Sequence, residues 1–289
     1  TTIIIILSSI VLNAQNTDLY KSIVKELSSK EYSGRGYAYD GVLKAGDYIA
    51  EQFEAVGAKE ITVQPFKIDI NTFPGDMELS VDGHSLKAGE EFVTREFCPG
   101  VKGTYKLYYI DTTDYNSAKI FEDLARPENK DAFVVCDFMF SYRHRDDFQR
   151  LQTNGMCQNK GILFTWDAPM KFYKANGERV NDKPVIWVHP DFPKDGKTVT
   201  VNIENKFFEG YESNNVIAKI NGKSHDSCYV FIAHYDHMGN LGRDVYYPGV
   251  NDNASGTAGI ITFAEYYSQN RPQYDMYFIA FAGVEAGLR

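Results

Sequence analysis

The sequence contains few cysteines, and none of them lies in a CxxC motif. Cys98, Cys136, Cys157 and Cys228 are widely separated along the 289 residues. A zinc site built from thiolates is therefore not expected, because such sites use closely spaced pairs of cysteines. An exported chain could form disulfides from these residues. Four buried free thiols explain them equally well, and the spacing does not decide between the two.

Positive charge is also scarce. Lysine and arginine number 30 against 39 aspartate and glutamate residues, which gives a formal net charge of −9. Proteins that bind nucleic acid neutralise phosphates with an excess of lysine and arginine. No nucleic-acid partner is therefore expected.

Hydrophobic runs long enough to cross a membrane are missing too. The apolar run Ile3–Leu12, interrupted by Ser8 and Ser9, is too short for a membrane span but has the length of a signal-peptide core. Ala14 is a suitable small residue before a cleavage point. A charged leader is absent and the chain starts at Thr1, so we interpret residues 1–14 as a clipped signal peptide and expect export to the periplasm or the extracellular space. A buried strand or helix is the alternative.

The remaining sequence indicates three parts. Residues 15–60 predict two helices, the first capped by Asn16 or Thr17 and the second ending at Gly57. Residues 61–205 predict strands separated by turns, with one helix near residues 148–153. We expect this middle part to be an inserted, smaller α/β or β-rich domain.

Residues 206–289 show the clearest pattern. The apolar runs Tyr229–Ala233 and Met276–Ala282 flank a helical pattern from about Ala254 to Ser268. Strand, loop, helix and strand predict a βαβ unit whose strands are buried on both faces. The expected fold class is therefore α/β, with a mostly parallel sheet flanked by helices.

Polar residues follow each of these elements at the position where α/β sheets build their sites. His234 and Asp236 follow the first strand, Asp252 lies at the start of the helix, and Glu285 follows the last strand. Imidazole and carboxylate ligands suit zinc, and a carboxylate can bridge two ions. Asp236 points to the same side as His234 and could orient its imidazole. Taken one at a time, His234 would be a surface or packed histidine, Asp252 a helix N-cap and Glu285 a solvated loop carboxylate.

Three motifs carry a further signal, and they are His234–Gly239, Gly249–Gly256 and Phe281–Leu288. In order and spacing they resemble those of the co-catalytic zinc aminopeptidases, a family that also contains glutamate-carboxypeptidase-like enzymes and glutaminyl cyclases. The N-terminal Tyr32–Gly36 followed by an amphipathic helix is similar to the opening of the same family. The middle part is similar to a protease-associated domain, through the helix and strand of residues 152–164.

The resemblance implies a site with two zinc ions, in which His234 binds one ion, Glu285 binds the other and Asp252 bridges them. Asp236 would orient His234. A metal-activated water would attack the first peptide bond of a substrate with a free N-terminus. The implied activity is that of an aminopeptidase or dipeptidase.

Two departures from the family pattern reduce the expected activity. The family has a glutamate, which takes the proton from the attacking water, where this chain has Val284. The family also uses an aspartate and a histidine further along the chain, whereas this sequence ends at Arg289. We therefore expect an N-terminal fragment, C-terminally truncated within the peptidase domain, that binds zinc weakly or partially and is inactive. A non-catalytic binding module and a glutaminyl cyclase are the alternatives, and neither substrate preference nor oligomeric state is indicated.

Overall fold

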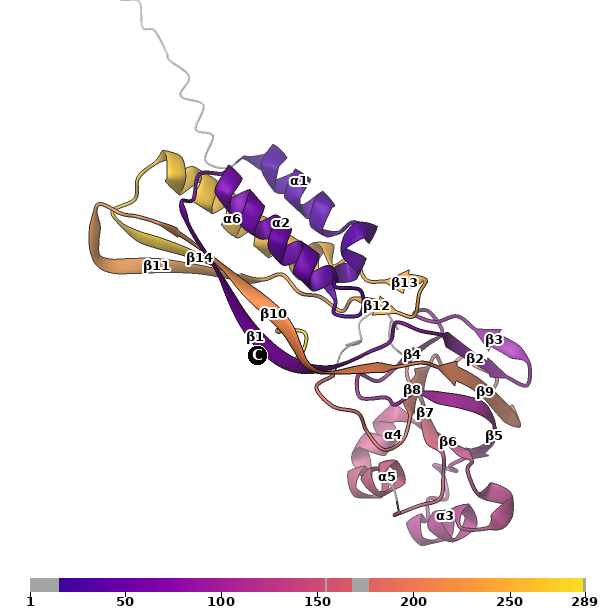
Figure 1. The fold of residues 1–289 in the computed structure, drawn as a ribbon. Helices are drawn as coiled ribbons and strands as arrows, with labels where there is room; N and C mark the ends of the chain where they lie inside the picture. The colour runs from indigo at the N-terminus through magenta and orange to yellow at the C-terminus, as the bar shows by residue number, and fades with distance from the viewer. Residues whose placement is uncertain (1–15, 154, 168–176, 288–289) are drawn as a thin grey trace, which may run out of the picture.

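The computed structural model describes residues 16–153, 155–167 and 177–287. The predicted signal peptide, residues 1–14, lies outside this part, as do Asn154 of the protease-associated-like passage and Leu288 of the third motif. The described chain forms two lobes (Figure 1). One carries three helices on one face of a sheet, and the other contains a second sheet with shorter helices.

The two predicted N-terminal helices are confirmed. Helix α1 spans Thr17–Leu27, and the side chain of Asn16 caps it by accepting a hydrogen bond of 3.0 Å from the backbone N–H of Leu19. Helix α2 spans Gly41–Ala55. Gly57, just beyond its end, has a φ of +97°, a conformation that glycine adopts without strain. A short helical turn, η1, joins the two helices and spans Lys30–Arg35.

The first lobe is built on a four-stranded sheet in the order β1-β10-β14-β11. Strand β11 runs parallel to β14, whereas β10 runs antiparallel to both β14 and β1. The α/β class is confirmed, but the described sheet is mixed and not mostly parallel. The reason is that β1 and β10 are the two arms of a long antiparallel pair, and the inserted part connects them. The strands are β1 (Glu60–Thr72), β10 (Lys206–Ile220), β11 (Ser224–His234) and β14 (Tyr274–Phe281).

Helices α1, α2 and α6 cover one face of this sheet (Figure 1). Helix α6 spans Ser255–Gln269, as the helical pattern predicted. The apolar core between helices and sheet includes Ile49, Phe53 and Phe278, all fully buried. The expectation that both strands of the βαβ unit are buried on both faces is wrong for β11. Its Val230 and Ile232 are 52% and 65% exposed, because they lie beside Tyr277 and Ile279 on the face of the sheet that α1, α2 and α6 do not cover. Tyr229 is 56% exposed as well, on a strand at the edge of the described sheet.

The second lobe contains an eight-stranded sheet in the order β3-β2-β9-β5-β6-β7-β8-β4. It starts at Met77 and ends at Ile203, and these two residues are paired with each other. The boundary expected at residue 61 therefore falls inside β1, which belongs to the first sheet. The eight strands are β2 (Met77–Val81), β3 (His84–Leu86), β4 (Phe92–Thr94), β5 (Val101–Tyr109), β6 (Phe133–Asp137), β7 (Gly161–Thr165), β8 (Val185–Val188) and β9 (Thr198–Ile203).

The centre of this second sheet is parallel, because β5, β6, β7 and β8 pair in the same direction. Short helices connect these strands, which makes the insert an α/β unit with its own apolar core. All four cysteines are free thiols, two of them buried. The connecting elements are α3 (Ser117–Leu124), η2 (Pro127–Asn129), α4 (Phe138–Arg143) and α5 (Arg145–Gln152).

The two lobes meet at the loop that follows β11. This loop forms a small hairpin of β12 (Asn240–Leu241) and β13 (Val245–Tyr246). Met238, Leu241 and Tyr247 from this region pack into the core of the second lobe. The loop that begins at His234 is therefore held from both sides.

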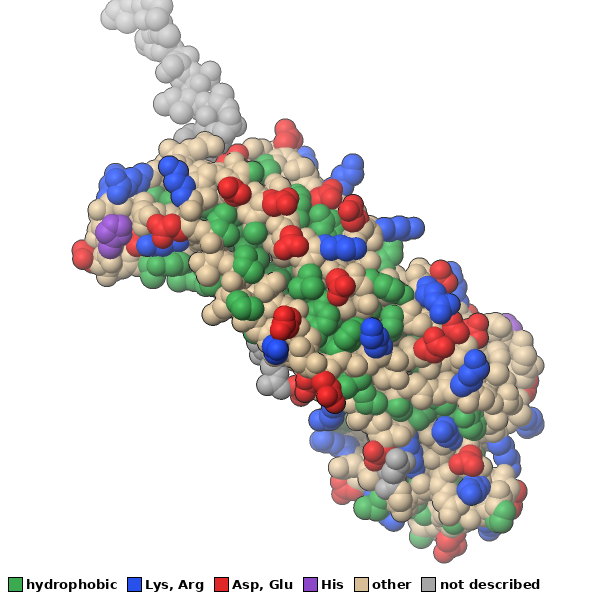
Figure 2. All heavy atoms as spheres, in the orientation of Figure 1, with side chains coloured by type: hydrophobic (Ala, Val, Ile, Leu, Met, Phe, Trp, Pro, Cys, Tyr) green, Lys and Arg blue, Asp and Glu red, His purple; other side chains and the backbone are tan. Residues whose placement is uncertain are grey.

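The surface carries charges of both signs. Figure 2 shows acidic and basic side chains interspersed on this face of both lobes. Among the described helices, none is both long and apolar enough to cross a bilayer.

Candidate metal centre

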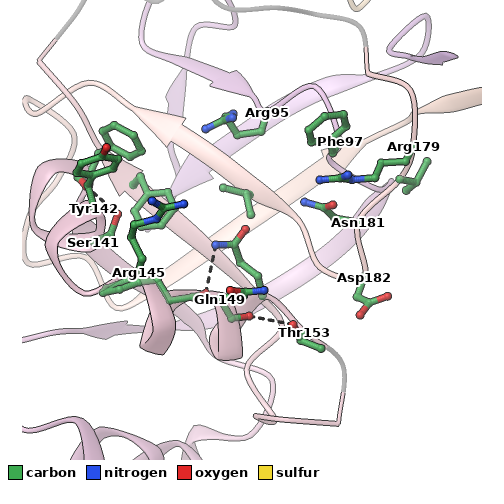
Figure 3. A pocket seen from close by; sticks show the side chains of 16 residues that line it. Arg95, Phe97, Ser141, Tyr142, Arg145, Gln149, Thr153, Arg179, Asn181 and Asp182 are labelled. Carbon is green, nitrogen blue, oxygen red and sulfur yellow. Dashed lines mark hydrogen bonds between the residues drawn. The ribbon is translucent and has the colours of Figure 1, made fainter. Parts of the chain in front are cut away.

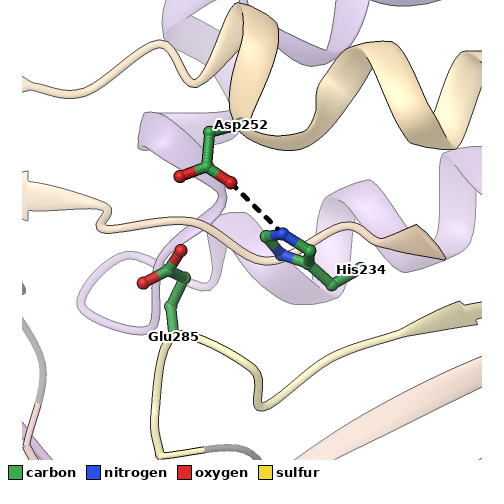
Figure 4. A group of neighbouring side chains, drawn as sticks. All are labelled: His234, Asp252 and Glu285. Carbon is green, nitrogen blue, oxygen red and sulfur yellow. Dashed lines mark ion pairs between the residues drawn. The ribbon is translucent and has the colours of Figure 1, made fainter.

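The structure brings together the three residues that the motifs singled out as ligands. His234 is the last residue of β11, Asp252 lies in the helical turn η4 (Val250–Ala254) before α6, and Glu285 follows β14. One ligand atom from each lies within 4.8 Å of the other two. Figure 4 shows both carboxylates turned toward the imidazole.

This arrangement fits zinc. Ligand atoms on one tetrahedral zinc ion are about 3.3–3.5 Å apart, because each bond is about 2.0–2.2 Å long. The Nε2 atom of His234 lies 3.2 Å from the Oδ1 atom of Asp252. Two carboxylates this close to each other and to an imidazole also favour a bound cation, which would offset their mutual repulsion. The donor set of one nitrogen and two carboxylates is one that zinc accepts.

Asp252 does not act as an ordinary helix cap. In the structure it is Asn253 whose Oδ1 atom accepts the hydrogen bond from the backbone N–H of Gly256, at 3.0 Å. The side chain of Asp252 is 61% exposed and faces His234 instead. The alternative interpretation of Asp252 as an N-cap therefore does not describe its position.

Asp236 is fully buried behind the three ligands and connects two of them. Its Oδ2 atom accepts hydrogen bonds from the Tyr37 hydroxyl at 2.9 Å and from the backbone N–H groups of Gly283 and Glu285 at 3.0 Å each. Its Oδ1 atom lies 3.5 Å from the Nδ1 atom of His234. One carboxylate thus holds the backbone of Glu285 and faces the imidazole of His234.

The contact with Asp236 leaves Nε2 of His234 as the nitrogen available to a metal. Nδ1 lies 3.2 Å from the carbonyl oxygen of Asp236 as well as 3.5 Å from its carboxylate, so we assign the ring proton to Nδ1. The hydrogen bond to Asp236 raises the pKa of the imidazole above its ordinary value. A carboxylate behind a ligating histidine also makes the imidazole a stronger donor.

Arg35 holds the loop that carries Asp252. Its side chain is completely buried, and its guanidinium donates to backbone carbonyl oxygens of described residues. Burial lowers the pKa of Arg35 to about 10, so the group remains charged at neutral pH. Its acceptors are the carbonyls of Leu27 (2.7 Å), Tyr235 (2.7 Å), Pro248 (2.8 Å), Gly249 (2.8 Å) and Asp252 (3.3 Å).

His237 is a further buried group beside the ligands. Its Nδ1 atom lies 4.0 Å from the Oδ2 atom of Asp252 and has no hydrogen-bond partner in the described part of the chain. Burial, and then the charge of Arg35, lowers the pKa of His237 to about 4, which keeps the ring neutral at pH 7.

The sequence did not reveal the roles of Tyr37 and Arg35. Arg35 was part of the N-terminal motif, but its spacing from the other motifs gave no sign that it reaches Asp252. Tyr37 carries no local signal at all, because its partner Asp236 is 199 residues away.

Comparison with known proteins identifies the region that carries the site. Residues 215–289 match the model of peptidase family M28. This region, about a quarter of the chain, is similar to the M28 peptidases. The resemblance of this region to the co-catalytic zinc aminopeptidases is thereby confirmed. A probable zinc metalloprotease of Pyricularia oryzae is 38% identical over 77 residues, which are 26% of this chain and 15% of that protein.

Solved structures share the fold across both lobes. The zinc aminopeptidase BSAP of Bacillus subtilis is 18% identical, with a TM-score of 0.62, over 92% of this chain and 61% of that one. An M28 peptidase precursor of Shewanella amazonensis is 14% identical, with a TM-score of 0.64, over 95% and 66%. An aminopeptidase of Aneurinibacillus sp. strain AM-1 is 19% identical, with a TM-score of 0.57, over 94% and 64%. The chain therefore spans less than two thirds of each of these M28-like structures and a smaller part of the Pyricularia protein.

Proposed function

We propose that this chain provides the metal-binding part of a zinc exopeptidase of the aminopeptidase or dipeptidase type, acting on peptides with a free N-terminus. The observation that carries the proposal is the convergence of His234, Asp252 and Glu285 within 4.8 Å. They come from three separate elements, and each stands where an α/β sheet places its functional residues. The match of residues 215–289 to family M28 supports the same conclusion.

The geometry supports a proposed role for each residue. His234 and Asp252 face each other closely enough to share one zinc ion, and the exposed carboxylate of Asp252 leaves its second oxygen for an ion held by Glu285. Asp236 fixes the ring of His234 and the backbone of Glu285. Zinc bound here would lower the pKa of a coordinated water and polarise the peptide carbonyl. The proposal also includes two zinc ions and export of the protein. The support for export is the apolar run of residues 3–12.

Val284 limits what this site does. It is half-buried between Gly283 and Glu285, and its isopropyl group has no atom that accepts a proton. A positioned general base contributes about 10²–10⁴ to the rate. We therefore propose that peptide hydrolysis by this protein is slower by about that factor than in an M28 peptidase with glutamate at this position. Val284 is also the observation that favours a second candidate, a non-catalytic module that binds peptides without cleaving them.

The test compares Val284 with Val284→Glu in the longest form of the polypeptide that its gene encodes. Zinc content and hydrolysis of aminoacyl p-nitroanilides and dipeptides are measured for both. We expect both forms to bind zinc and the glutamate form to be about 10²–10⁴ times faster. A glutamate form that binds zinc but cleaves no such substrate would refute the peptidase assignment, and equal rates would refute the role of position 284. His234→Ala should lower zinc binding in both forms.

A further inference from the structure

The second lobe contains a cavity of about 530 Å³ that is separate from the metal centre. Helices α4 and α5 form one side of it, and residues 95–97 and 179–182 lie across from them (Figure 3). None of His234, Asp252 and Glu285 lines it. Its volume falls within the range of about 300–1,000 Å³ that is usual for ligand sites.

Three arginines line this cavity, in a chain whose net charge is −9. Arg145 comes from α5, whereas Arg95 and Arg179 come from the segments across the cavity (Figure 3). Asp182 is the single carboxylate among the described lining residues. Guanidinium groups therefore outnumber carboxylates, and the cavity concentrates positive charge on an acidic protein.

Two of these charges are not neutralised by the described part of the chain. Arg95 pairs with Glu96 at 2.8 Å. The guanidinium groups of Arg145 and Arg179 make no ion pair or hydrogen bond with a described residue. Each guanidinium instead lies over an aromatic ring, Arg145 at 5.7 Å from the centre of Tyr142 and Arg179 at 4.5 Å from that of Phe97.

A cation–π contact leaves an arginine available to a ligand. It attracts the positive charge to the ring face and uses none of the N–H donors in a hydrogen bond. The donors of Arg145 and Arg179 are thus left for a group outside the described chain. A planar carboxylate matches them, because it can accept two parallel hydrogen bonds from one guanidinium.

The rest of the lining favours a peptide over a small inorganic anion. Phe138, Phe148, Phe164 and Val185 add apolar surface, and the amides of Gln149 and Asn181 add groups that bind a peptide backbone. We infer that this cavity, the arginine pocket, binds an acidic peptide segment. Its carboxylates pair with Arg145 and Arg179, and an apolar side chain between them packs on the phenylalanines.

The binding test uses a peptide that the metal centre cannot process. Acetyl-Glu-Leu-Glu-Leu-amide, blocked at both ends, is titrated into the protein by calorimetry in the presence of EDTA. We expect binding that weakens as salt is added, since the ion pairs are exposed to solvent. The matched acetyl-Gln-Leu-Gln-Leu-amide should bind at least about tenfold more weakly, because it cannot form the charge-assisted hydrogen bonds to the two guanidinium groups.

Variants then locate the site. Arg145→Gln with Arg179→Gln should weaken binding of the glutamate peptide at least about tenfold. Arg126→Gln is the matched control, because Arg126 pairs with Asp123 outside the cavity and its loss removes the same charge. It should change the affinity by less than about twofold. Circular dichroism and thermal unfolding check that all variants fold.

Three results would overturn the inference. They are a glutamine peptide that binds as tightly as the glutamate peptide, an Arg126→Gln effect as large as that of the double variant, and no detectable binding of the glutamate peptide at millimolar concentration. Displacement of the peptide by an equal concentration of inorganic phosphate would show a general oxyanion site and would overturn the assignment to peptides.

Discussion

Arg35 donates a hydrogen bond of 3.3 Å to the carbonyl oxygen of Asp252, although the two residues are 217 positions apart in the sequence. The same guanidinium binds the carbonyl of Tyr235, next to the ligand His234, at 2.7 Å. A single buried side chain therefore sets the distance between two loops, each of which presents one candidate metal ligand.

Removing this side chain should destabilise the first lobe. Arg35→Met would leave several buried carbonyl oxygens without a donor, and each such group costs about 1–3 kcal/mol. We expect the free energy of unfolding to fall by at least about 3 kcal/mol in urea titrations. Arg126→Met should change it by less than about 1 kcal/mol, because Arg126 makes an exposed ion pair. A urea midpoint of Arg35→Met equal to that of the wild type would contradict the role of Arg35.

Asp236 is expected to control metal affinity without contacting the metal. In Asp236→Asn, the amide keeps the size of the carboxylate but loses the negative charge that faces Nδ1 of His234. Loss of such a partner lowers metal affinity by about 10–100-fold. Competition with a chromophoric zinc chelator measures this change. Asp146→Asn serves as the control, because Asp146 is exposed. A zinc affinity of Asp236→Asn within twofold of that of the wild type would be inconsistent with the positioning role of Asp236.

Tyr247 should make stability depend on alkaline pH. Burial raises the pKa of its hydroxyl from the ordinary 10.0 to about 12. The unfolded chain therefore loses this proton before the folded protein does, so the contribution is complete below pH 10 and is lost as the pH rises toward 12. Between pH 9 and 11.5 the wild type should lose about 2 kcal/mol more stability than Tyr247→Phe, measured by urea unfolding. An identical decline in both proteins would show that Tyr247 ionises as freely in the folded state as in the unfolded state.

The four thiols should differ in reactivity. Burial raises the pKa of both Cys98 and Cys136 to about 12, so almost no thiolate is present at pH 8. Cys228 is exposed on β11. With a thiol-specific disulfide reagent at pH 8, Cys228 should react in the fast phase, and Cys98 and Cys136 only after unfolding. The fast phase should disappear in Cys228→Ser, and its persistence at full amplitude would assign it to another cysteine.

Much of the metal centre was predictable from the sequence, because each ligand directly follows or precedes an element with a strong local pattern. The apolar runs before His234 and Glu285 have the length of buried strands, and the helical pattern begins just after Asp252. The α/β class and the inserted position of the middle part follow from the same patterns.

The rest of the fold depends on contacts between distant residues. Local patterns do not show that β14 lies between β10 and β11, or that residues 60–72 pair with residues 206–220. The exposure of Ile232 was missed for the same reason, since a local apolar run does not show which face of the sheet the helices cover. The hydrogen bond between Tyr37 and Asp236 joins two elements whose proximity is itself a result of folding.

The pairing of Met77 with Ile203 has a consequence for how the chain folds. Once the inserted sheet is complete, its two ends lie side by side, and β1 and β10 leave it as neighbours with Thr72 opposite Lys206. Without the inserted sheet, β1 and β10 would have to meet across more than a hundred residues of flexible chain, at the entropic cost of closing that loop. With it, their pairing extends from Thr72 and Lys206, which are already adjacent. The inserted lobe thus takes the place of the turn in a long β-hairpin formed by β1 and β10. We expect these two strands to pair from the inserted lobe outward, toward the part of the sheet that lies beside the candidate metal centre.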